Sequence, residues 1–348
     1  MSRARLSTVA LIIFGCPISV TAVTTPAAAA TLSEIPIPAN IVSLQGMILG
    51  GDGNLWAGSA GPRIVKITTT GAMTAYPLPF PKPGDYEGTY YSLAKGPSGE
   101  VWWATFARFE DNVGKVSTAD GKATLLVTFK RDGSGPHKPA RKLQLGPDGN
   151  MWFSYDRNPN GFLGYITPAG SVTYVDYAPK NANGTKVATA PFDLKWASDG
   201  SLWFADFVGS IGHFDPRTNA AILYPMKSPQ AGPKDLAIGP DGNIWTSYAF
   251  GNGTGAAVAR VTPAGAVTEF PVPYTVKPGA SLPISMIASP DGAMWYADES
   301  AKLIVRVAMD GTITTMPTPY EPETLVVGSD GGIWIQYRSN KSLGKITF

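Results

Sequence analysis

Two positions in each of seven sequence repeats hold most of the residues of this chain that could do chemistry. Each repeat contains one motif that ends in tryptophan. The first position lies eleven residues before that tryptophan and the second lies three residues after it. The first set is Gln45, Tyr91, Arg141, Phe192, Lys234, Ile284 and Glu323. The second set is Ser59, Thr105, Tyr155, Asp206, Tyr248, Asp298 and Tyr337. Aromatic rings can stack on a ligand and charged groups can orient it, so this mixture indicates a site for a small polar or cyclic molecule.

Some members of these sets, with one neighbour, are candidates for catalysis. Glu323 and Asp298 supply carboxylates, Tyr337 supplies a hydroxyl group that can donate a proton, and Glu321 lies two residues before Glu323. Such groups can act as general acids or bases on a bound substrate. The candidates for ligand binding are Tyr91, Arg141, Tyr155, Asp206, Lys234 and Tyr248. The alternative is a solvated rim in which Arg141 and Lys234 only balance the carboxylates.

The repeat that carries these positions predicts the architecture. One copy of its motif is Gly-Pro-Asp-Gly-Asn-Ile-Trp at 239–245. Related copies end at Trp56, Trp102, Trp152, Trp203, Trp245, Trp295 and Trp334, with steps of 46, 50, 51, 42, 50 and 39 residues. Repeats of this length are typical of stacked units such as propeller blades. We expect the tryptophans to pack between adjacent blades rather than to form a ligand cage.

The fifth repeat shows how one unit should fold. Apolar runs at 236–238 and 244–248 flank a Pro-Asp-Gly turn, and runs at 257–261 and 267–273 flank a Thr-Pro-Ala-Gly turn. This pattern predicts four antiparallel strands, A to D, in each repeat. The predicted fold is therefore all-β, a seven-bladed β-propeller of four-stranded antiparallel blades. Loop length varies mainly in the B–C and D–A connections, which emerge on one face, so we expect the site on that face over the central channel.

The two ends of the chain are predicted to complete one blade together. The last repeat ends at Phe348, directly after its strand C, and has no strand D of its own. Residues 32–38, Leu-Ser-Glu-Ile-Pro-Ile-Pro, are similar to the D strands of other repeats. We therefore expect the N-terminal strand to join the last blade, which removes an open sheet edge. The alternative is an open or six-bladed array.

Residues 1–30 have the features of a secretory signal peptide. Arg3 and Arg5 form a basic start, residues 9–20 are mostly apolar, and residues 27–30 are alanines suited to cleavage. Cleavage near Ala30 would leave 31–348 as a single propeller domain, secreted or periplasmic, with no cysteine. The alternative is a lipoprotein anchored at Cys16, the only cysteine of the chain.

The charge balance argues against two classes of partner. The chain has 28 Lys and Arg and 26 Asp and Glu, and loss of Arg3 and Arg5 with residues 1–30 would leave 26 of each. This balance argues against nucleic acid or a charged membrane surface as the main partner. The apolar run near the N-terminus is too short to span a membrane. We expect a small-molecule or glycan ligand and a monomeric protein.

The repeated Gly-Pro-Asp-Gly-Asn-X-Trp motif, followed by the strand and turn pattern at 258–273, resembles the streptogramin B lyase (virginiamycin B lyase) family. The resemblance covers essentially all of 32–348 and implies a seven-bladed propeller. Those lyases open a cyclic antibiotic by eliminating its ester linkage, without attack by water. They use a magnesium ion, a histidine base and glutamates at the channel mouth. The resemblance thus implies Mg²⁺ near Glu321 and Glu323.

This chain departs from the family at the reactive positions. Where the family has Glu-Pro-His, it has Glu321-Pro322-Glu323; Tyr337-Arg338 replaces a glutamate, and Ile284 replaces a second histidine. Histidine is the side chain that titrates near neutral pH, and a carboxylate base would need its pKa raised by burial. Of the two histidines, His213 is predicted to be structural, and His137 lies in a loop.

Three functions follow as alternatives. The first is a lyase-like enzyme (a carbon–oxygen lyase) with altered catalytic groups. The second is a non-catalytic ligand-binding propeller, and the third is a protein-interaction propeller of the cell envelope. We predict that streptogramin B itself is not opened.

Overall fold

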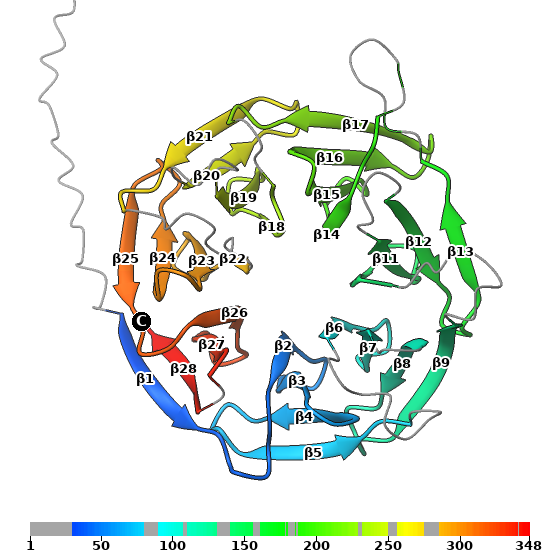
Figure 1. Cartoon of the computed structure of the whole chain (residues 1–348), viewed down its shortest axis with the longest axis vertical. Coiled ribbons are helices and arrows are strands. Elements are labelled where there is room, and N and C mark those ends of the chain that lie inside the picture. Colours follow the sequence, from blue (N-terminus) through cyan, green and yellow to red (C-terminus); the bar gives the residue numbers. More distant parts are fainter. Residues whose placement is uncertain are drawn as a thin grey trace, which may run out of the picture.

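The computed structural model describes residues 30–79, 90–106, 110–130, 140–155, 161–177, 179, 185, 187–228, 232–249, 256–274, 285–339 and 341–348. Within these ranges the chain forms seven sheets of four antiparallel strands, arranged as a ring around a central axis (Figure 1). The predicted seven-bladed β-propeller is confirmed.

Each blade runs outward from the axis in the order A, B, C, D. The innermost A strands are β2 (Gln45–Leu49), β6 (Tyr90–Lys95), β10 (Lys142–Leu145), β14 (Pro191–Trp196), β18 (Leu236–Ile238), β22 (Met286–Ala288) and β26 (Pro322–Val327). The B strands are β3 (Leu55–Ser59), β7 (Val101–Phe106), β11 (Met151–Tyr155), β15 (Leu202–Asp206), β19 (Ile244–Ala249), β23 (Met294–Asp298) and β27 (Ile333–Tyr337).

The outer two strands of each blade complete the sheets. The C strands are β4 (Arg63–Ile67), β8 (Glu110–Val116), β12 (Phe162–Ile166), β16 (Ser210–Asp215), β20 (Ala256–Val261), β24 (Leu303–Val307) and β28 (Ser342–Thr347). The D strands are β5 (Met73–Pro77), β9 (Ala123–Lys130), β13 (Val172–Val175), β17 (Ala220–Pro225), β21 (Val267–Pro271), β25 (Ile313–Pro317) and, in the last blade, β1 (Thr31–Pro36).

The last blade is closed by both ends of the chain, as predicted. Strand β1 pairs antiparallel with β28, so that Leu32 lies opposite Ile346 and Ile35 lies opposite Leu343. The amide of Ile37 continues the pairing by donating to the carbonyl of Lys341 at 3.2 Å. In Figure 1 β1 lies beside the C-terminus. Strand β1 therefore covers the outer edge of β28 and completes the four strands of the last blade.

The A–B turn explains why the motif is repeated. In the fifth blade Gly242 has a φ of +73°, which favours glycine, and its amide donates to the carbonyl of Gly239 at 2.9 Å. Asp241 Oδ1 accepts from the amide of Asn243 at 3.1 Å and from Trp245 Nε1 at 3.0 Å. The aspartate of the motif thus fixes both the turn and the indole that follows it.

The seven motif tryptophans pack between blades, as predicted, and are at most 5 % exposed. Trp245 belongs to a core cluster with Met294 and Val305 of the next blade, and Trp334 closes the ring against Leu55 and Val65 of the first blade. The second blade varies the pattern, because Glu100 Oε1 accepts from Trp102 Nε1 at 2.9 Å in place of the motif aspartate. The repeated tryptophan is therefore a packing residue.

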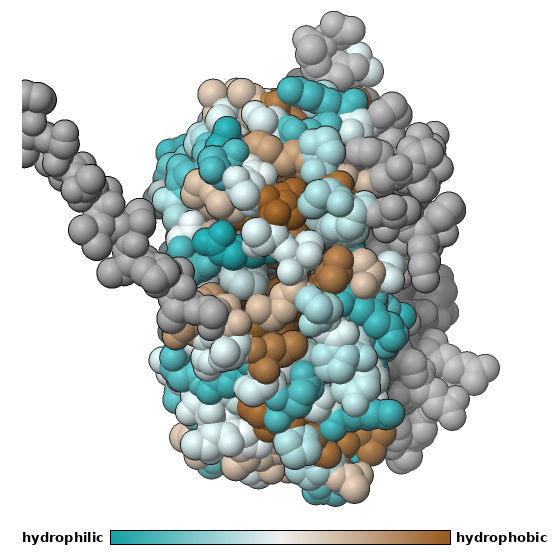
Figure 2. Space-filling model, turned by 90° about the vertical axis from the view of Figure 1, so that its left-hand side faces the viewer, coloured by the Kyte–Doolittle hydropathy of each residue, from teal (hydrophilic) through white to brown (hydrophobic). Residues whose placement is uncertain are grey.

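The outer wall is formed by the partly exposed D strands. In β25 Ile313 and Met316 are half-buried, and the other three residues are exposed. Figure 2 views this side of the ring, where hydrophilic and hydrophobic residues form a mosaic of small patches. The described residues contain no helix with the length and hydropathy needed to cross a membrane.

Candidate functional site: loop face and central channel

Two of the positions eleven residues before a tryptophan, Arg141 and Lys234, lie over aromatic rings. The Arg141 guanidinium lies 4.6 Å from the ring centre of Phe192 in the next blade, and Lys234 Nζ lies 5.3 Å from the ring centre of Phe207. Tyr91 lies in β6 opposite Thr105, but its side chain is outside the described part. Ile284 is also outside the described residues.

The positions three residues after each tryptophan are mostly buried and do not form an open channel mouth. Six of them are at most 3 % exposed: Ser59, Thr105, Asp206, Tyr248, Asp298 and Tyr337. Tyr155 is half-buried, with its ring centre 4.9 Å from that of Phe162. The expectation that both sets line one open entrance was therefore wrong for these six residues.

Several of these buried side chains form hydrogen bonds with neighbouring segments of the chain. Asp206 accepts from the amide of Ala190 at 2.7 Å. Asp298 accepts from Tyr274 Oη at 2.8 Å and from the amide of Ala301 at 2.9 Å. Tyr337 points outward and donates its hydroxyl to Glu34 Oε1 of β1 at 2.9 Å. Catalytic roles for Asp298 and Tyr337 stay predictions, since these contacts account for both residues structurally.

The carboxyl group of Asp206 has a raised pKa. Burial raises the pKa of Asp206 to about 6, against the opposing effect of the amides of Ala190 and Val208. Its Oδ2 atom is buried and has no hydrogen-bond partner among the described residues. The environment therefore favours the neutral acid below about pH 6.

A network of charged residues joins blades six and seven on the loop face. Glu299 follows β23 and is 5 % exposed, and its Oε1 pairs with Arg338 Nη1, which follows β27. Glu321 Oε1 lies 2.8 Å from Lys302 Nζ, and the carbonyl of Glu321 accepts from the amide of Arg338 at 2.9 Å. Glu323 Oε2 accepts from Gln336 Nε2 at 2.8 Å. We call Glu299, Lys302, Glu321, Glu323 and Arg338 the loop-face network.

Protonation within the loop-face network is uneven. Burial raises the pKa of Glu299; Arg338 opposes this shift, and the charges of Glu323 and Glu321 add to it. Lys302, in contrast, lowers the pKa of Glu321 through a hydrogen bond. The network therefore holds one acid that retains its proton more readily than an ordinary glutamate and another that loses it more readily.

The two residues expected near Mg²⁺ do not form a magnesium site as they are placed. Glu321 is paired with Lys302, and Glu323 accepts from Gln336. Among the described residues no three His, Cys, Asp or Glu side chains converge as a metal site would require. Use of Mg²⁺ stays a prediction from the family resemblance.

Of the two histidines, His213 lies in the part of the chain that the structure describes. His213 stacks on Trp203 in the fourth blade, with ring centres 4.4 Å apart, and burial lowers its pKa. This contact agrees with the predicted structural role. His137 is outside the described residues.

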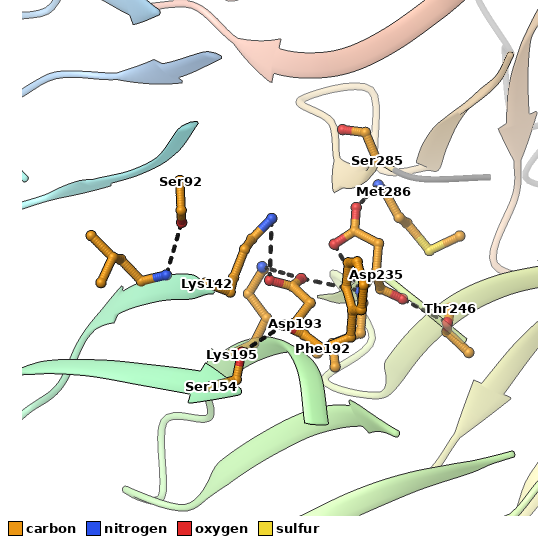
Figure 3. Close-up of polar contacts among 12 residues, drawn as sticks. Ser92, Lys142, Ser154, Phe192, Asp193, Lys195, Asp235, Thr246, Ser285 and Met286 are labelled. Atoms are coloured by element: carbon orange, nitrogen blue, oxygen red, sulfur yellow. Dashed lines mark hydrogen bonds and ion pairs between the residues drawn. The ribbon is translucent and has the colours of Figure 1, made fainter. Parts of the chain in front are cut away.

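A second charged cluster lines the central channel and was missed by the sequence reasoning (Figure 3). Asp193 of β14 forms an ion pair with Lys195 Nζ at 2.7 Å and a second one with Lys142 Nζ of the neighbouring blade at 3.4 Å. Asp235, just before β18, accepts from the amide of Met286 at 2.6 Å. Lys142, Asp193 and Asp235 each lie ten residues before a motif tryptophan, one place after the position chosen from sequence.

The carboxylates of this cluster have opposite protonation preferences. Burial disfavours the charged form of Asp193, but Lys142 and Lys195 outweigh it and hold its pKa well below the usual range. Burial and the charge of Asp193 raise the pKa of Asp235 well above its usual value. Asp193 also raises the pKa of Lys142. The cluster thus combines two ammonium groups, one carboxylate and one acid that favours its neutral form.

The fold and the charged inner face define a seven-bladed propeller with a potential ligand site. Comparisons with known proteins show which proteins it is similar to. The Virginiamycin B lyase family model matches residues 180–348. Virginiamycin B lyase of Nocardia farcinica (strain IFM 10152) is 28 % identical over 256 residues, which cover 72 % of this chain and 78 % of that protein.

Solved structures support the same fold. Virginiamycin B lyase from Staphylococcus aureus superposes with a TM-score of 0.73 at 22 % identity, covering 92 % of this chain and 99 % of the other. A catalytically inactive variant of the S. aureus lyase, determined with quinupristin, gives a TM-score of 0.71 at 21 % identity over the same shares of the two chains. These structural matches show the fold alone. Together with the sequence matches, they describe a seven-bladed propeller that is similar in sequence to virginiamycin B lyases.

Proposed function

We propose that this protein is a secreted or periplasmic propeller that binds a small cyclic or polyhydroxylated molecule on its loop face, at the junction of blades six and seven. The observation that supports this proposal is the loop-face network. It brings three glutamates, one arginine and one lysine together from two blades, including a carboxyl group buried beside Arg338. Burial of ionisable groups is costly, and such groups concentrate at functional sites.

The residues of the loop-face network suit hydroxyl-rich ligands. Carboxylates accept hydrogen bonds from hydroxyl groups, and the guanidinium of Arg338, whose side chain is 61 % exposed, can donate to ester or glycosidic oxygens. Tyr320, whose ring centre lies 5.6 Å from that of Tyr337, adds an aromatic surface nearby. A cyclic ligand can use both kinds of contact.

A second candidate is cleavage of that ligand by elimination. In such a step a base removes a proton from carbon next to a carbonyl, the carbon–oxygen bond to the leaving group breaks, and a carbon–carbon double bond forms. Glu323 occupies the position where the resemblance expects histidine, and the raised pKa of Glu299 supplies an acid that holds its proton. If the protein only binds the ligand, neither Glu323 nor Glu299 needs to transfer a proton.

The test uses purified protein with quinupristin and a set of neutral oligosaccharides as probes. We expect at least one probe to raise the melting temperature of the wild type, and Glu323→Gln to reduce that shift while keeping the unliganded melting temperature. Small molecules released from the denatured protein are surveyed by mass spectrometry. Binding on the loop face is refuted if no probe shifts the melting temperature and no molecule is retained.

Mass spectrometry of the probes after incubation tests cleavage. We expect quinupristin to remain intact, because the histidine base is missing. Turnover of another probe that Glu323→Gln abolishes would establish elimination. Rapid linearisation of quinupristin by the wild type would contradict our prediction about the missing base.

A further inference from the structure

The central channel has two chemically different walls. Its cavity has a volume of about 710 Å³ and is lined by the A strands of all seven blades. Blades two, three and four contribute Lys95, Lys142 and Lys195. The wall formed by the other blades is mainly aliphatic and includes Leu49, Ile238, Ile287, Val326 and Val327.

The ammonium groups face the cavity, whereas their counter-charges lie behind them. The side chains of Lys142 and Lys195 are 38 % and 29 % exposed, but the side chain of Asp193 is fully buried. Lys95 is exposed and also lines the cavity. A molecule in the channel therefore meets ammonium groups before it meets the carboxylate of Asp193.

The remaining acid on the channel wall does not cancel this positive charge. Asp235 accepts from the backbone amides of Met286 at 2.6 Å and Leu236 at 2.9 Å. Burial and the charge of Asp193 raise its pKa well above the usual value, so the neutral form is favoured. Three ammonium groups are then opposed by one ionised carboxylate, Asp193.

We infer that the central channel binds a small organic anion, whose anionic group contacts the lysines of blades two to four and whose apolar body packs on the aliphatic wall opposite. A cavity of this size suits a small molecule with one or two rings. Positive charge within a narrow, largely apolar channel attracts anions more strongly than the same charge on an open surface. This site is separate from the loop-face network, so either proposal can fail alone.

The test is isothermal titration with 2-naphthoate, which combines a carboxylate with an apolar ring system. The neutral analogue 2-naphthamide and inorganic sulfate are compared at low ionic strength. We expect naphthoate to bind with 1:1 stoichiometry and at least about tenfold more tightly than naphthamide or sulfate, the factor expected for one charged hydrogen bond. Equal affinity for naphthamide would show that the site does not require an anionic group. Equal affinity for sulfate would show that the site does not require an apolar body.

Variants locate the site within the channel. Lys195→Met should weaken naphthoate binding about tenfold, and Lys95→Met should weaken it several-fold without removing a partner of Asp193. The matched control is Lys122→Met, which removes the same charge from an exposed turn outside the channel and should leave affinity unchanged. No binding of naphthoate by the folded wild type, or equal binding by wild type and Lys95→Met, would overturn the inference.

Discussion

The motif tryptophans and the residues ten places before them occupy equivalent positions in every blade, yet they differ in how strictly they repeat. The tryptophan is the same in all seven blades and is buried between sheets. The channel-side position holds Gly46, Ser92, Lys142, Asp193, Asp235, Ser285 and Thr324. A residue repeated without change solves the same packing problem in each blade, whereas a varied one can make each part of the channel wall chemically different.

The varied position also has a structural task in several blades. Ser92 Oγ accepts from the amide of Leu143 in the next blade at 2.9 Å, and Ser285 Oγ accepts from the amide of Leu325 at 2.9 Å. Asp235 does the same for Met286. Serine and aspartate can both accept this hydrogen bond, so the inner ring keeps its blade-to-blade link while its charge varies.

The largest effect on stability should follow from removing one of the repeated tryptophans. Trp245→Ala should lower the free energy of unfolding by about 3–5 kcal/mol, because it leaves a cavity between blades five and six. Trp196→Ala, which removes a half-buried indole that lines the channel, should cost less than half as much. Denaturant unfolding measures both, and equal losses would contradict the distinction between the two positions.

A pH-dependent effect is expected at Asp206, a buried member of another varied position. Its pKa of about 6 in the folded protein exceeds the ordinary value of 3.8, so its contribution to stability is greatest below pH 3.8 and is lost as pH rises through 6. Asp206→Asn should therefore gain up to about 3 kcal/mol relative to the wild type between pH 4 and pH 7.

The control for this pH series is Asp215→Asn in the same blade. Hydrogen bonds from Arg217 lower the pKa of Asp215, so its substitution should give a small trend of the opposite sign. Urea unfolding at pH 4, 5, 6 and 7 measures both differences. A flat difference between Asp206→Asn and the wild type would show that Asp206 ionises normally in the folded protein.

A smaller effect tests why the aspartate accompanies the tryptophan. Asp241→Ala removes the acceptor for Trp245 Nε1 and for the amide of Asn243, and should cost about 1–2 kcal/mol. Asp241→Asn keeps an acceptor oxygen and should recover most of this loss. Thermal unfolding compares the two variants, and the explanation fails if alanine is tolerated as well as asparagine.

The smallest effect on stability is expected at the varied channel wall. Lys95→Met should change the free energy of unfolding by less than about 0.5 kcal/mol, because the side chain is exposed in the channel. The same denaturant measurement applies. A loss above about 2 kcal/mol would mean that Lys95 is held as firmly as the packing residues.

Much of the fold could be predicted because the repeat combines turn residues with a buried anchor. In the fifth blade the predicted strands at 236–238 and 244–248 match β18 and nearly match β19. The proline-containing strand at 32–38 correctly predicted closure by β1. These features depend on local chemistry, such as glycine at positive φ and proline at a sheet edge, which the sequence displays directly.

The candidate site was harder to predict because it depends on which side of strand A faces the channel. Register shifts occur at the start of this strand between Gln45 and Met47, between Pro191 and Leu194, and between Pro322 and Thr324. A shift of one residue exchanges the two faces of a strand. The inner strand pairs of blades three and five have a regular register. There the prediction chose Arg141 and Lys234, each one residue before Lys142 and Asp235, which line the channel.

By itself the sequence determined the number of blades, the strands of each blade, the packing role of the tryptophans and the joining of the two ends. Each of these follows from short motifs whose effects reach only a few residues or one repeat. The tertiary structure alone decided that Lys142, Asp193 and Asp235 meet across three blades and that Asp298 and Tyr337 are buried. Those outcomes depend on the curvature of the ring and on bulges in its inner strands, and no single repeat encodes them.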